Sequence, residues 1–367
     1  MPFSLDALRR WPDLEGPDLV AVDAADRLLL DESAAARAGL GDGQLVVIGD
    51  AYGTLTLAAA DAGARGIRVH QDELTGERAL TANAETTGLE GTFASHERDA
   101  ALLADARVVL LRLPRSLREL HDLAGLIALH AHPDVVVFAG GRLKHMTVTM
   151  NEVLRERFGR LDVSHARQKS RVLIARDPRA GADPQPEGAR VDGLEVRAFG
   201  GVFAGASLDI GTRLLLAHLP EPVGDEAIDL ACGTGVVAAT LAVRHPSLRV
   251  HASDQSALAV ASARATAAAN GVADRVTVVR DDMLRSRADD SAAFIALNPP
   301  FHSGAAVTEG IAPRMFADAA RVLRPGGELW TVWNSALQYR PALERLVGPT
   351  RQVARDRKFT VTVSTRR

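Results

Sequence analysis

The sequence predicts an α/β protein of two tandem domains, each built on a mostly parallel, doubly wound sheet. Short apolar segments alternate with helical segments along the C-terminal half, a pattern typical of a parallel sheet covered by helices on both faces. The N-terminal half repeats the same order of elements, which indicates an internal duplication. The length of 367 residues also suits two domains of roughly 100–200 residues each.

In the C-terminal half, short apolar runs bounded by turn residues predict strands, and longer periodic segments predict helices. Strands are expected at residues 227–230, 248–253, 276–279, 294–297, 328–333 and 359–364. Helices are expected at residues 236–244, 256–270 and 313–323, the last ending at the sequence RPGG. In open sheets of this kind the ligand binds beyond the carboxyl ends of the strands, so the turns that follow the strands are where chemistry is expected.

The N-terminal half follows the same plan. Residues 45–60 parallel residues 227–242, and residues 66–91 parallel residues 248–274, which aligns Asp72 with Asp254. Further strands are expected at 108–113 and 135–138. The copies differ where a ligand would bind: Tyr52 stands near the place of Gly233, and LRLPR (111–115) replaces LNPPF (297–301). We therefore expect that the N-terminal copy has kept the fold and lost the site.

A segment rich in Pro, Gly and charge, residues 177–193, shows no hydrophobic period and is expected to join the two halves. The predicted organisation is a degenerate domain at 1–178, a linker at 179–194 and a catalytic domain at 195–367.

Composition narrows the class of protein. Hydrophobic residues make up 47% and charged residues 24%, as in soluble globular proteins. No apolar run approaches the roughly 20 residues of a membrane helix, and the N-terminus lacks the pattern of a secretory signal. The lone cysteine, Cys232, permits no internal disulfide. These observations predict a cytoplasmic protein, with a two-domain monomer as the default. We expect no metal, because the sequence has no Cys/His cluster with ligand spacing.

The stretch IDLACGTG (228–235) combines a strand, a glycine turn with Gly233 and Gly235, and the start of a helix. Glycines allow a close backbone approach to a ligand, and the helix N-terminus offers unpaired N–H groups. Asp229 lies inside the apolar strand, and a buried carboxylate needs a partner. That partner is either the ammonium of an amino-acid ligand or the nearby backbone N–H groups.

Two later strands also end in acidic residues. Asp254, followed by Gln255, is predicted either to accept hydrogen bonds from ribose hydroxyls or to cap the next helix. At Asp281-Asp282-Met283 a carboxylate suits the amino group of an adenine, and the methionine suits its ring face; an ordinary turn is the alternative.

These turns, in this order, resemble those of the class I S-adenosylmethionine-dependent methyltransferases, over about residues 195–367. The resemblance implies two tandem Rossmann-like methyltransferase domains, S-adenosyl-L-methionine as cofactor and S-adenosyl-L-homocysteine as product. It also implies a set of donor-binding residues: Asp209, Gly211, Asp229, Ala231, Gly233, Gly235, Asp254, Gln255, Asp281, Asp282, Met283 and Asn298.

The sequence Asn298-Pro299-Pro300-Phe301 supplies the catalytic residues of this interpretation. An exocyclic amino group on a base is a poor nucleophile, because its lone pair is delocalised into the ring. The Asn298 side-chain oxygen and the Pro299 carbonyl can accept its two N–H bonds, and proline fixes the aim of that carbonyl. Phe301 can stack on a base turned out of its helix. A Pro-Pro turn closing a buried strand is the plain structural alternative.

The motif NPPFH resembles the ribosomal RNA guanine-N2 methyltransferases. LDIG (208–211), TVWNSALQY (331–339) and RKFTV (357–361) also resemble this branch, and VVIGDAYGTL (46–55) resembles its large-subunit members, which carry an inactive duplicate domain. The resemblance implies N2-methylation of one guanine in large-subunit ribosomal RNA, with protein-free RNA as the substrate. His302 is either an RNA contact or the cap of the following turn.

The net charge of −3 does not itself indicate nucleic acid, but residues 142–179 hold ten Lys/Arg against four acids. Such a region is either a solvated helix face or a patch that binds phosphates. The candidate RNA-binding residues are Arg142, Lys144, Arg167, Lys169, Arg171, His302, Arg357 and Lys358.

Three alternatives remain at this point. One is a guanine-N2 methyltransferase of small-subunit rRNA, whose family shares the duplicated architecture. The second is a protein glutamine N5-methyltransferase, whose motif overlaps but more often has Tyr where this chain has Phe301. The third, a non-catalytic RNA-binding assembly protein, would fit if both halves had lost their donor site.

Overall fold

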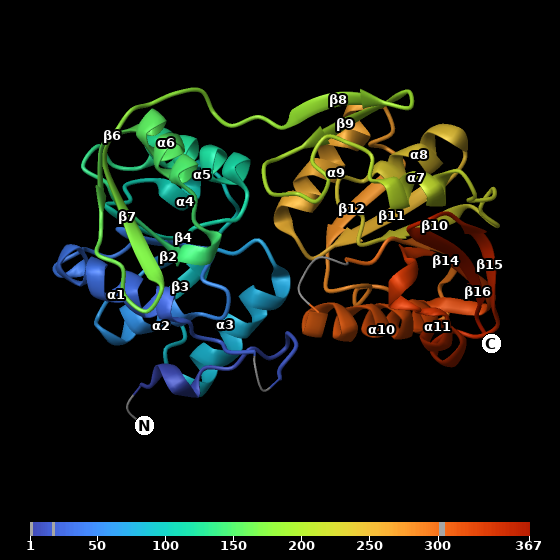
Figure 1. Ribbon diagram of the computed structural model, residues 1–367, viewed down its shortest axis with the longest axis horizontal. Coiled ribbons are helices and arrows are strands. Elements are labelled where there is room, and N and C mark those ends of the chain that lie inside the picture. Colours follow the sequence, from blue (N-terminus) through green and yellow to red (C-terminus); the bar gives the residue numbers. More distant parts are fainter. Residues whose placement is uncertain (1–2, 17–18, 301–304) are drawn as a thin grey trace. The chain divides into compact units, whose positions relative to one another are not determined.

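The structure is a computed structural model that describes residues 3–16, 19–300 and 305–367. The chain divides into two compact units, Met1–Gln185 and Pro186–Arg367, each described below by itself (Figure 1). The segment expected to be a linker, 179–194, contains the strand β8 (Glu187–Val191), which pairs antiparallel with β9 (Leu194–Ala198). Part of that segment is therefore a hairpin of the second unit.

The first unit holds a seven-stranded sheet in the order β3-β2-β1-β4-β5-β7-β6 among its described residues. Its strands are β1 (Leu45–Ile48), β2 (Ile67–His70), β3 (Phe93–Ser95), β4 (Val108–Arg112), β5 (Val136–Arg142), β6 (Phe158–Val163) and β7 (Ser170–Pro178). Its helices are α1 (Ala24–Arg37), α2 (Thr54–Asp61), α3 (Leu74–Thr87), α4 (Ala100–Leu103), α5 (Leu117–His130) and α6 (Val148–Arg157), with short 3₁₀ turns at Leu5–Ala7 and Leu143–His145.

The second unit repeats this order as β12-β11-β10-β13-β14-β16-β15, again within the described chain. Its strands are β10 (Glu226–Leu230), β11 (Arg249–Asp254), β12 (Val276–Arg280), β13 (Ala292–Leu297), β14 (Leu323–Asn334), β15 (Thr350–Arg355) and β16 (Phe359–Thr365). Its helices are α7 (Ile210–Leu216), α8 (Val236–Arg244), α9 (Ala257–Ala269), α10 (Ala305–Val322) and α11 (Arg340–Leu346), with a 3₁₀ turn at Ser335–Leu337. The predicted duplication and the mostly parallel sheets are confirmed.

Each sheet buries both of its faces, as parallel sheets require. Along β13, Phe294 and Ala296 pack on one core with residues of α8 and α9, while Ile295 and Leu297 pack on the other with residues of α10 and α11. Neighbouring side chains of a strand point to opposite faces, so this alternation places helices on both sides of the sheet, as Figure 1 shows. The strands of the first unit divide in the same way between two cores.

The backbone of the turn after the first strand confirms how the copies align. Ala231, Gly233 and Gly235 have φ of +57°, +52° and +72°. In the first unit the same left-handed conformation recurs at every second residue, at Gly49 (+77°), Ala51 (+58°) and Gly53 (+94°). Gly53 and Gly235 each precede the next helix as its N-cap. Ala51 therefore matches Gly233, and Tyr52, which we expected near Gly233, stands one residue later.

Some predicted bounds were wrong. The helix expected at 313–323 begins at Ala305 and contains Pro313. The strand expected from residue 328 begins at Leu323, because Ala292 of β13 already pairs with Leu323 across an irregular register. The elements α7, α11 and β15 were not predicted.

Candidate active site

The carboxyl ends of the central strands of the second sheet surround a recess. Asp229 and the turn after β10 form part of its lining, and Asn298, directly after β13, forms another part. The remaining wall comes from the segment before α7 and from its first turn. The lining residues are Phe203, Ala204, Ser207, Leu208, Asp209, Thr212, Asp229, Ala231, Cys232, Gly233, Thr234, Val236, Val237 and Asn298. Five of them, Asp209, Asp229, Ala231, Gly233 and Asn298, were predicted to bind the donor.

The two glycines of the turn do different work. A Cβ on Gly233 would meet no atom within 4 Å, so this residue leaves space open at the recess. A Cβ on Gly235 would lie 2.8 Å from the Cβ of Ala263, so this glycine permits close packing of the turn against α9. The Gly233 N–H donates to Oδ2 of Asp254 at 2.9 Å, which joins the ends of β10 and β11.

Asp229 is buried, with 3% of its surface exposed. Its Oδ2 accepts a hydrogen bond from the Ala238 N–H at 2.9 Å. Burial, opposed by that hydrogen bond and reinforced by the charge of Asp254, raises the pKa of Asp229 to about 7. A carboxylate held at such an elevated pKa gains from a nearby positive charge, so the site fits the ammonium group of S-adenosylmethionine.

The acids after β11 and β12 are tied to neighbouring backbone and side chains. Oδ1 of Asp254 accepts from the Ser256 N–H at 3.0 Å, and Oδ2 of Asp281 accepts from the Ser286 N–H at 2.7 Å. Asp282 is buried and pairs with Arg285 at 3.4 Å. These acids, together with Gln255 and Met283, lie beside the recess but do not line it. Their expected contacts with ribose and adenine stay predictions.

Asn298 holds its carboxamide in one orientation. Its Nδ2 donates to Oγ1 of Thr212 at 2.8 Å and faces Oδ2 of Asp209 at 3.3 Å. Its Oδ1 is buried and, among the described residues, has no hydrogen-bond partner. A buried acceptor without a donor carries a free-energy cost, and an incoming N–H group would remove that cost.

Thr212 is the residue that the sequence interpretation missed. It lies three positions after Asp209, which is the N-cap of α7 and accepts from the Thr212 N–H at 3.1 Å. Nothing in the sequence linked this position to Asn298. Gly211, between them, is buried, and a Cβ there would lie 2.9 Å from Oδ2 of Asp209 and 3.1 Å from the Phe359 ring. Gly211 therefore serves packing beside the recess.

The proline pair ends β13 as predicted. Pro299 is buried and Pro300 is exposed. Phe301 and His302 lie outside the described residues, so their predicted roles stay predictions.

The first unit has a different residue in the place of Asn298. Ile48 of β1 pairs with Leu111, and Leu230 of β10 pairs with Leu297. Arg112 and Asn298 directly follow these two leucines, so they occupy equivalent positions. Arg112 forms ion pairs with Asp23 at 3.2 Å and with Asp26 at 3.3 Å. A guanidinium has donors only and cannot accept a hydrogen bond from an amino group. The first unit therefore lacks the acceptor that the proposed chemistry requires.

Most of the basic residues predicted to bind RNA lie on the side of each sheet where the parallel strands have their carboxyl ends. In the first unit, Arg142 ends β5 and pairs with Ser170, and the Leu143 N–H donates to the Lys169 carbonyl at 2.9 Å. The pKa of His145 in the same turn is lowered by burial and by the charges of Arg115, Lys144 and Arg142. We call Arg115, Arg142, Lys144 and Lys169 the basic cluster.

The other candidates differ in how their charge is balanced. Arg171 pairs with Gly141 across β5 and β7, next to the basic cluster. Arg167 pairs with Asp31 at 2.8 Å, so its charge is partly neutralised. In the second unit, Arg357 and Lys358 form the turn between β15 and β16, and the Lys358 carbonyl accepts from the Ser335 N–H at 2.8 Å, directly after β14. They lie at the same sheet edge as Asn298.

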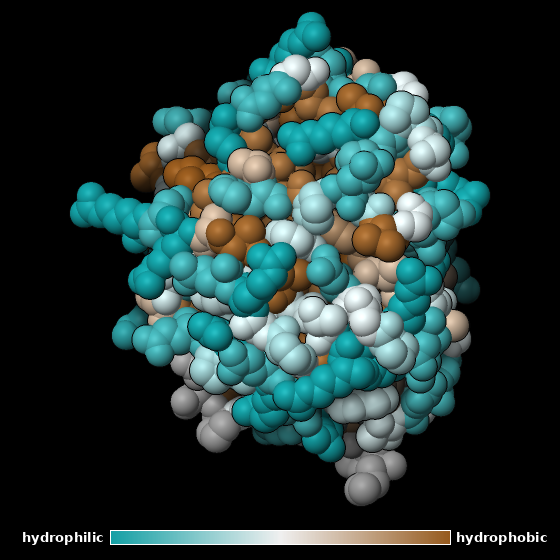
Figure 2. All heavy atoms as spheres, turned by 90° about the vertical axis from the view of Figure 1, so that its right-hand side faces the viewer, coloured by the Kyte–Doolittle hydropathy of each residue, from teal (hydrophilic) through white to brown (hydrophobic). Residues whose placement is uncertain are grey.

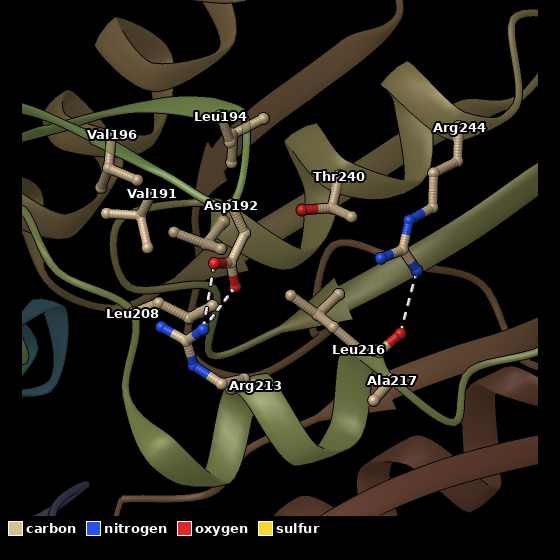
Figure 3. A pocket seen from close by; sticks show the side chains of 11 residues that line it. Val191, Asp192, Leu194, Val196, Leu208, Arg213, Leu216, Ala217, Thr240 and Arg244 are labelled. Atoms are coloured by element: carbon tan, nitrogen blue, oxygen red, sulfur yellow. Dashed lines mark hydrogen bonds and ion pairs between the residues drawn. The ribbon is translucent and has the colours of Figure 1, made fainter.

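A second recess, of about 150 Å³, lies between the β8–β9 hairpin, α7 and α8. Its walls are mostly aliphatic, and Arg213 donates to both carboxylate oxygens of Asp192, at 3.0 and 2.7 Å, along its lining (Figure 3). It shares Leu208 and Val236 with the first recess. Figure 2 shows apolar side chains among polar ones in the upper half of one face of this unit.

Two general findings complete the description. The described parts of the chain contain no cluster of three or more His, Cys, Asp or Glu side chains that would hold a metal ion. In the same residues, no helix is both long enough and apolar enough to cross a membrane.

Comparison with known proteins agrees with this geometry. The family described as "RLMG N-terminal domain" matches residues 2–179, and "Methyltransferase small domain" matches residues 193–363. The chain is 37% identical to the ribosomal RNA large subunit methyltransferase G of Streptomyces coelicolor, over 98% of each chain. It is 34% identical to the protein of the same name from Shewanella amazonensis, over 98% of this chain and 96% of the relative.

A solved structure shares the fold over nearly the whole chain. It is the 16S rRNA N2 G1207 methyltransferase (RsmC) of T. thermophilus, in complex with AdoMet and guanosine. The TM-score is 0.76 at 21% identity, covering 94% of this chain and 92% of that one. Given the duplicated fold, the two domain matches and the identity with curated relatives over 98% of its length, the chain belongs to the ribosomal RNA large subunit methyltransferase G family.

Proposed function

We propose that this protein is an S-adenosylmethionine-dependent methyltransferase that modifies the exocyclic N2 of a guanine in large-subunit ribosomal RNA. The observation that carries the proposal is the buried Oδ1 of Asn298, which has no hydrogen-bond partner among the residues that the structure describes and lies at the wall of the recess that Asp229 and Gly233 also line. Family membership gives the donor and the class of RNA, and the NPPF motif indicates a planar amino group as the acceptor.

The residues of the recess divide into two tasks. Asp229, Ala231 and Gly233 would hold S-adenosylmethionine, with Asp229 facing its ammonium and Gly233 leaving room for close approach. When bound, this group supplies a methyl on a sulfonium sulfur; transfer forms a C–N bond, leaves a neutral thioether and gives a cationic nitrogen that loses one proton to water. Asn298 orients the substrate amino group by accepting a hydrogen bond at its side-chain oxygen. The carbonyl of Pro299, whose backbone is fixed, is the second hydrogen-bond acceptor.

The proposal needs no side chain that acts as a strong base. The amino proton becomes acidic only as the nitrogen gains positive charge, so hydrogen-bond acceptors suffice to guide it. Orientation of the reacting groups is then the main contribution of the protein.

RNA binding is assigned to the sheet edges that carry positive charge. We propose the basic cluster of the first unit, with Arg171, and the turn with Arg357 and Lys358 in the second, as contacts to phosphates, which position RNA without reading its sequence. Arg167 contributes less, because Asp31 already pairs with it. We also propose that the domain division lies near residues 179–194, and that the protein acts as a monomer in the cytoplasm.

The direct test uses purified full-length protein, labelled S-adenosylmethionine and three substrates: deproteinised large-subunit rRNA, deproteinised small-subunit rRNA and a peptide release factor. We expect label in large-subunit RNA, recovered as N2-methylguanosine after nuclease digestion and mass spectrometry. Label confined to small-subunit RNA would move the substrate to the other subunit. Label in the release factor alone would favour the glutamine reaction and reject RNA as substrate.

A further inference from the structure

We propose that Asp209 and Thr212 are positioning residues that fix which way the Asn298 carboxamide faces. This inference rests on the proposed function, because it concerns the same amino-group acceptor. The two residues belong to the N-cap and first turn of α7, and both meet Asn298 at its nitrogen.

A carboxamide can rotate by half a turn and exchange its oxygen for its NH₂ group. Only one of the two orientations serves the reaction, since the substrate amino group offers N–H donors and needs an acceptor. In the observed orientation Nδ2 faces the Thr212 hydroxyl oxygen at 2.8 Å and the Asp209 carboxylate at 3.3 Å. The reverse orientation would bring Oδ1 against a carboxylate oxygen, which repels it. The charge of Asp209 therefore selects the productive orientation.

The same contact makes Oδ1 a stronger acceptor. A carboxamide whose N–H bonds donate to an anion carries more negative charge on its oxygen, because hydrogen bonds in a chain polarise one another. Asp209, Asn298 and the substrate amino group would form such a chain. The polarised oxygen faces the nitrogen that becomes positive during methyl transfer, where added negative charge lowers the barrier.

The first turn of α7 is held firmly enough for this task. Asp209 caps the helix, and Gly211 packs against Phe359 with no room for a side chain. A preorganised partner is what a positioning role requires.

The duplicated unit supports the assignment from within the same chain. There, too, the N-cap and first turn of a helix meet the residue at the carboxyl end of the fourth strand: Asp23 and Asp26 of α1 face Arg112. The acidic N-cap is present in both units, but in the first it neutralises a guanidinium. In the second unit, the acidic N-cap faces a carboxamide, which has a donor NH₂ group and an acceptor oxygen. The acid binds the NH₂ group, so the oxygen remains available to the substrate.

The test compares Thr212→Val with Thr212→Ser in the full-length protein. Valine keeps the shape of the side chain and removes the acceptor, while serine keeps the hydroxyl. We expect Thr212→Val to lower the single-turnover rate of methyl transfer to deproteinised large-subunit rRNA by about 10–100-fold, the range for residues that orient a catalytic group. Thr212→Ser should stay within about 3-fold of the wild type, since it can make the same contact.

A second variant, Asp209→Asn, tests the charge. Asparagine is an equally good N-cap, so α7 should still form, but the negative charge behind the carboxamide is lost. We expect a rate loss of at least about 10-fold. Arg213→Gln is the control for a general disturbance of α7, because it breaks only the exposed pair with Asp192; its rate should stay within about 2-fold of the wild type.

Calorimetric titration with S-adenosylmethionine separates positioning from donor binding. For Thr212→Val the dissociation constant should stay within about 3-fold, so the loss falls on the rate of transfer. If Thr212→Val and Asp209→Asn keep wild-type rates while Asn298→Ala loses activity, the positioning role is wrong and the proposed function stands. If Asn298→Ala itself keeps its activity, the acceptor role of Asn298 is wrong and the positioning role falls with it; the proposed function fails only if the wild-type protein transfers no methyl group to large-subunit rRNA. If Arg213→Gln lost as much rate as Thr212→Val, a general disturbance of α7 would explain both losses, and the inference would be overturned.

Discussion

Arg112 and Asn298 occupy the same place in the two sheets, each directly after the last residue that pairs with the central strand β1 or β10. The partners of the two residues are also in equivalent places: Asp23 and Asp209 are helix N-caps, and Asp26 and Thr212 each lie three residues later in the first turn. A guanidinium in place of a carboxamide removes the hydrogen-bond acceptor and creates a set of ion pairs. In the first unit this place therefore holds a set of ion pairs and no side-chain acceptor.

That contact predicts a stability effect that is specific to Arg112. Arg112→Met would leave the Asp26 carboxylate, whose side chain is 1% exposed, without its counter-charge, and we expect the first unit to lose about 2–3 kcal/mol. Burial already raises the pKa of Asp26 to about 7, and loss of Arg112 would raise it further. A raised carboxyl pKa means that the folded state binds more protons, so stability falls as pH rises towards that pKa, and the loss should be larger at pH 8 than at pH 6.

Thermal unfolding of Arg112→Met at these two pH values checks this prediction. Arg27→Met, on the same helix as Asp26, is the control. It breaks only the exposed pair with Asp6 and should change the free energy of unfolding by less than about 1 kcal/mol. Equal effects of the two substitutions would mean that Arg112 contributes no more than a surface pair.

Donor binding should depend on pH through Asp229. Burial raises its pKa to about 7, so at pH 6 the free protein holds a proton there, and an ammonium at the site would displace it. We expect affinity for S-adenosylmethionine to rise between pH 5.5 and pH 7, with release of up to one proton at pH 6. Calorimetry in buffers of different ionisation enthalpy measures that proton. Asp229→Asn should bind more weakly and without the pH dependence; if this substituted protein still released the proton, the proton would belong to another group.

Charge reversal of the basic cluster should weaken RNA binding. For Lys144→Glu combined with Lys169→Glu, we expect weaker binding to deproteinised rRNA and a shallower dependence on salt, since fewer counterions are released. Arg65→Glu, an exposed change just before the amino end of β2, is the matched control at the opposite sheet edge. Filter binding over a series of salt concentrations gives the slopes. A slope unchanged from wild type in the double variant would place the RNA surface elsewhere.

Local patterns were sufficient to predict two mostly parallel sheets and the ends of the central strands. The apolar runs before Asp229 and Asn298 are short and bounded by turn residues, so their type and end were readable. The hairpin strand β8 was not, because its sequence EGARV is polar and lies in a segment rich in Pro and Gly. Only its partner β9 and the packing behind it make it a strand.

The part of the site that the sequence could not predict depends on long-range contact. Thr212 lies 86 residues before Asn298 and meets it only because α7 packs at the end of β13. Similarly, the sequence placed Tyr52 only near the position of Gly233, while the backbone conformation aligns Ala51 there. Backbone conformation and tertiary contacts were needed for both assignments, because residue type alone does not determine either of them.

The most direct test of the central claim is the single-turnover rate of methyl transfer by Asn298→Ala to deproteinised large-subunit rRNA, measured at saturating S-adenosylmethionine. We predict a fall of about 10²–10³-fold, because the substrate amino group would lose a preorganised acceptor, while calorimetry shows donor affinity within about 3-fold of the wild type. A rate within a few-fold of the wild type would contradict the role given to Asn298 and, with it, the proposed chemistry of the site.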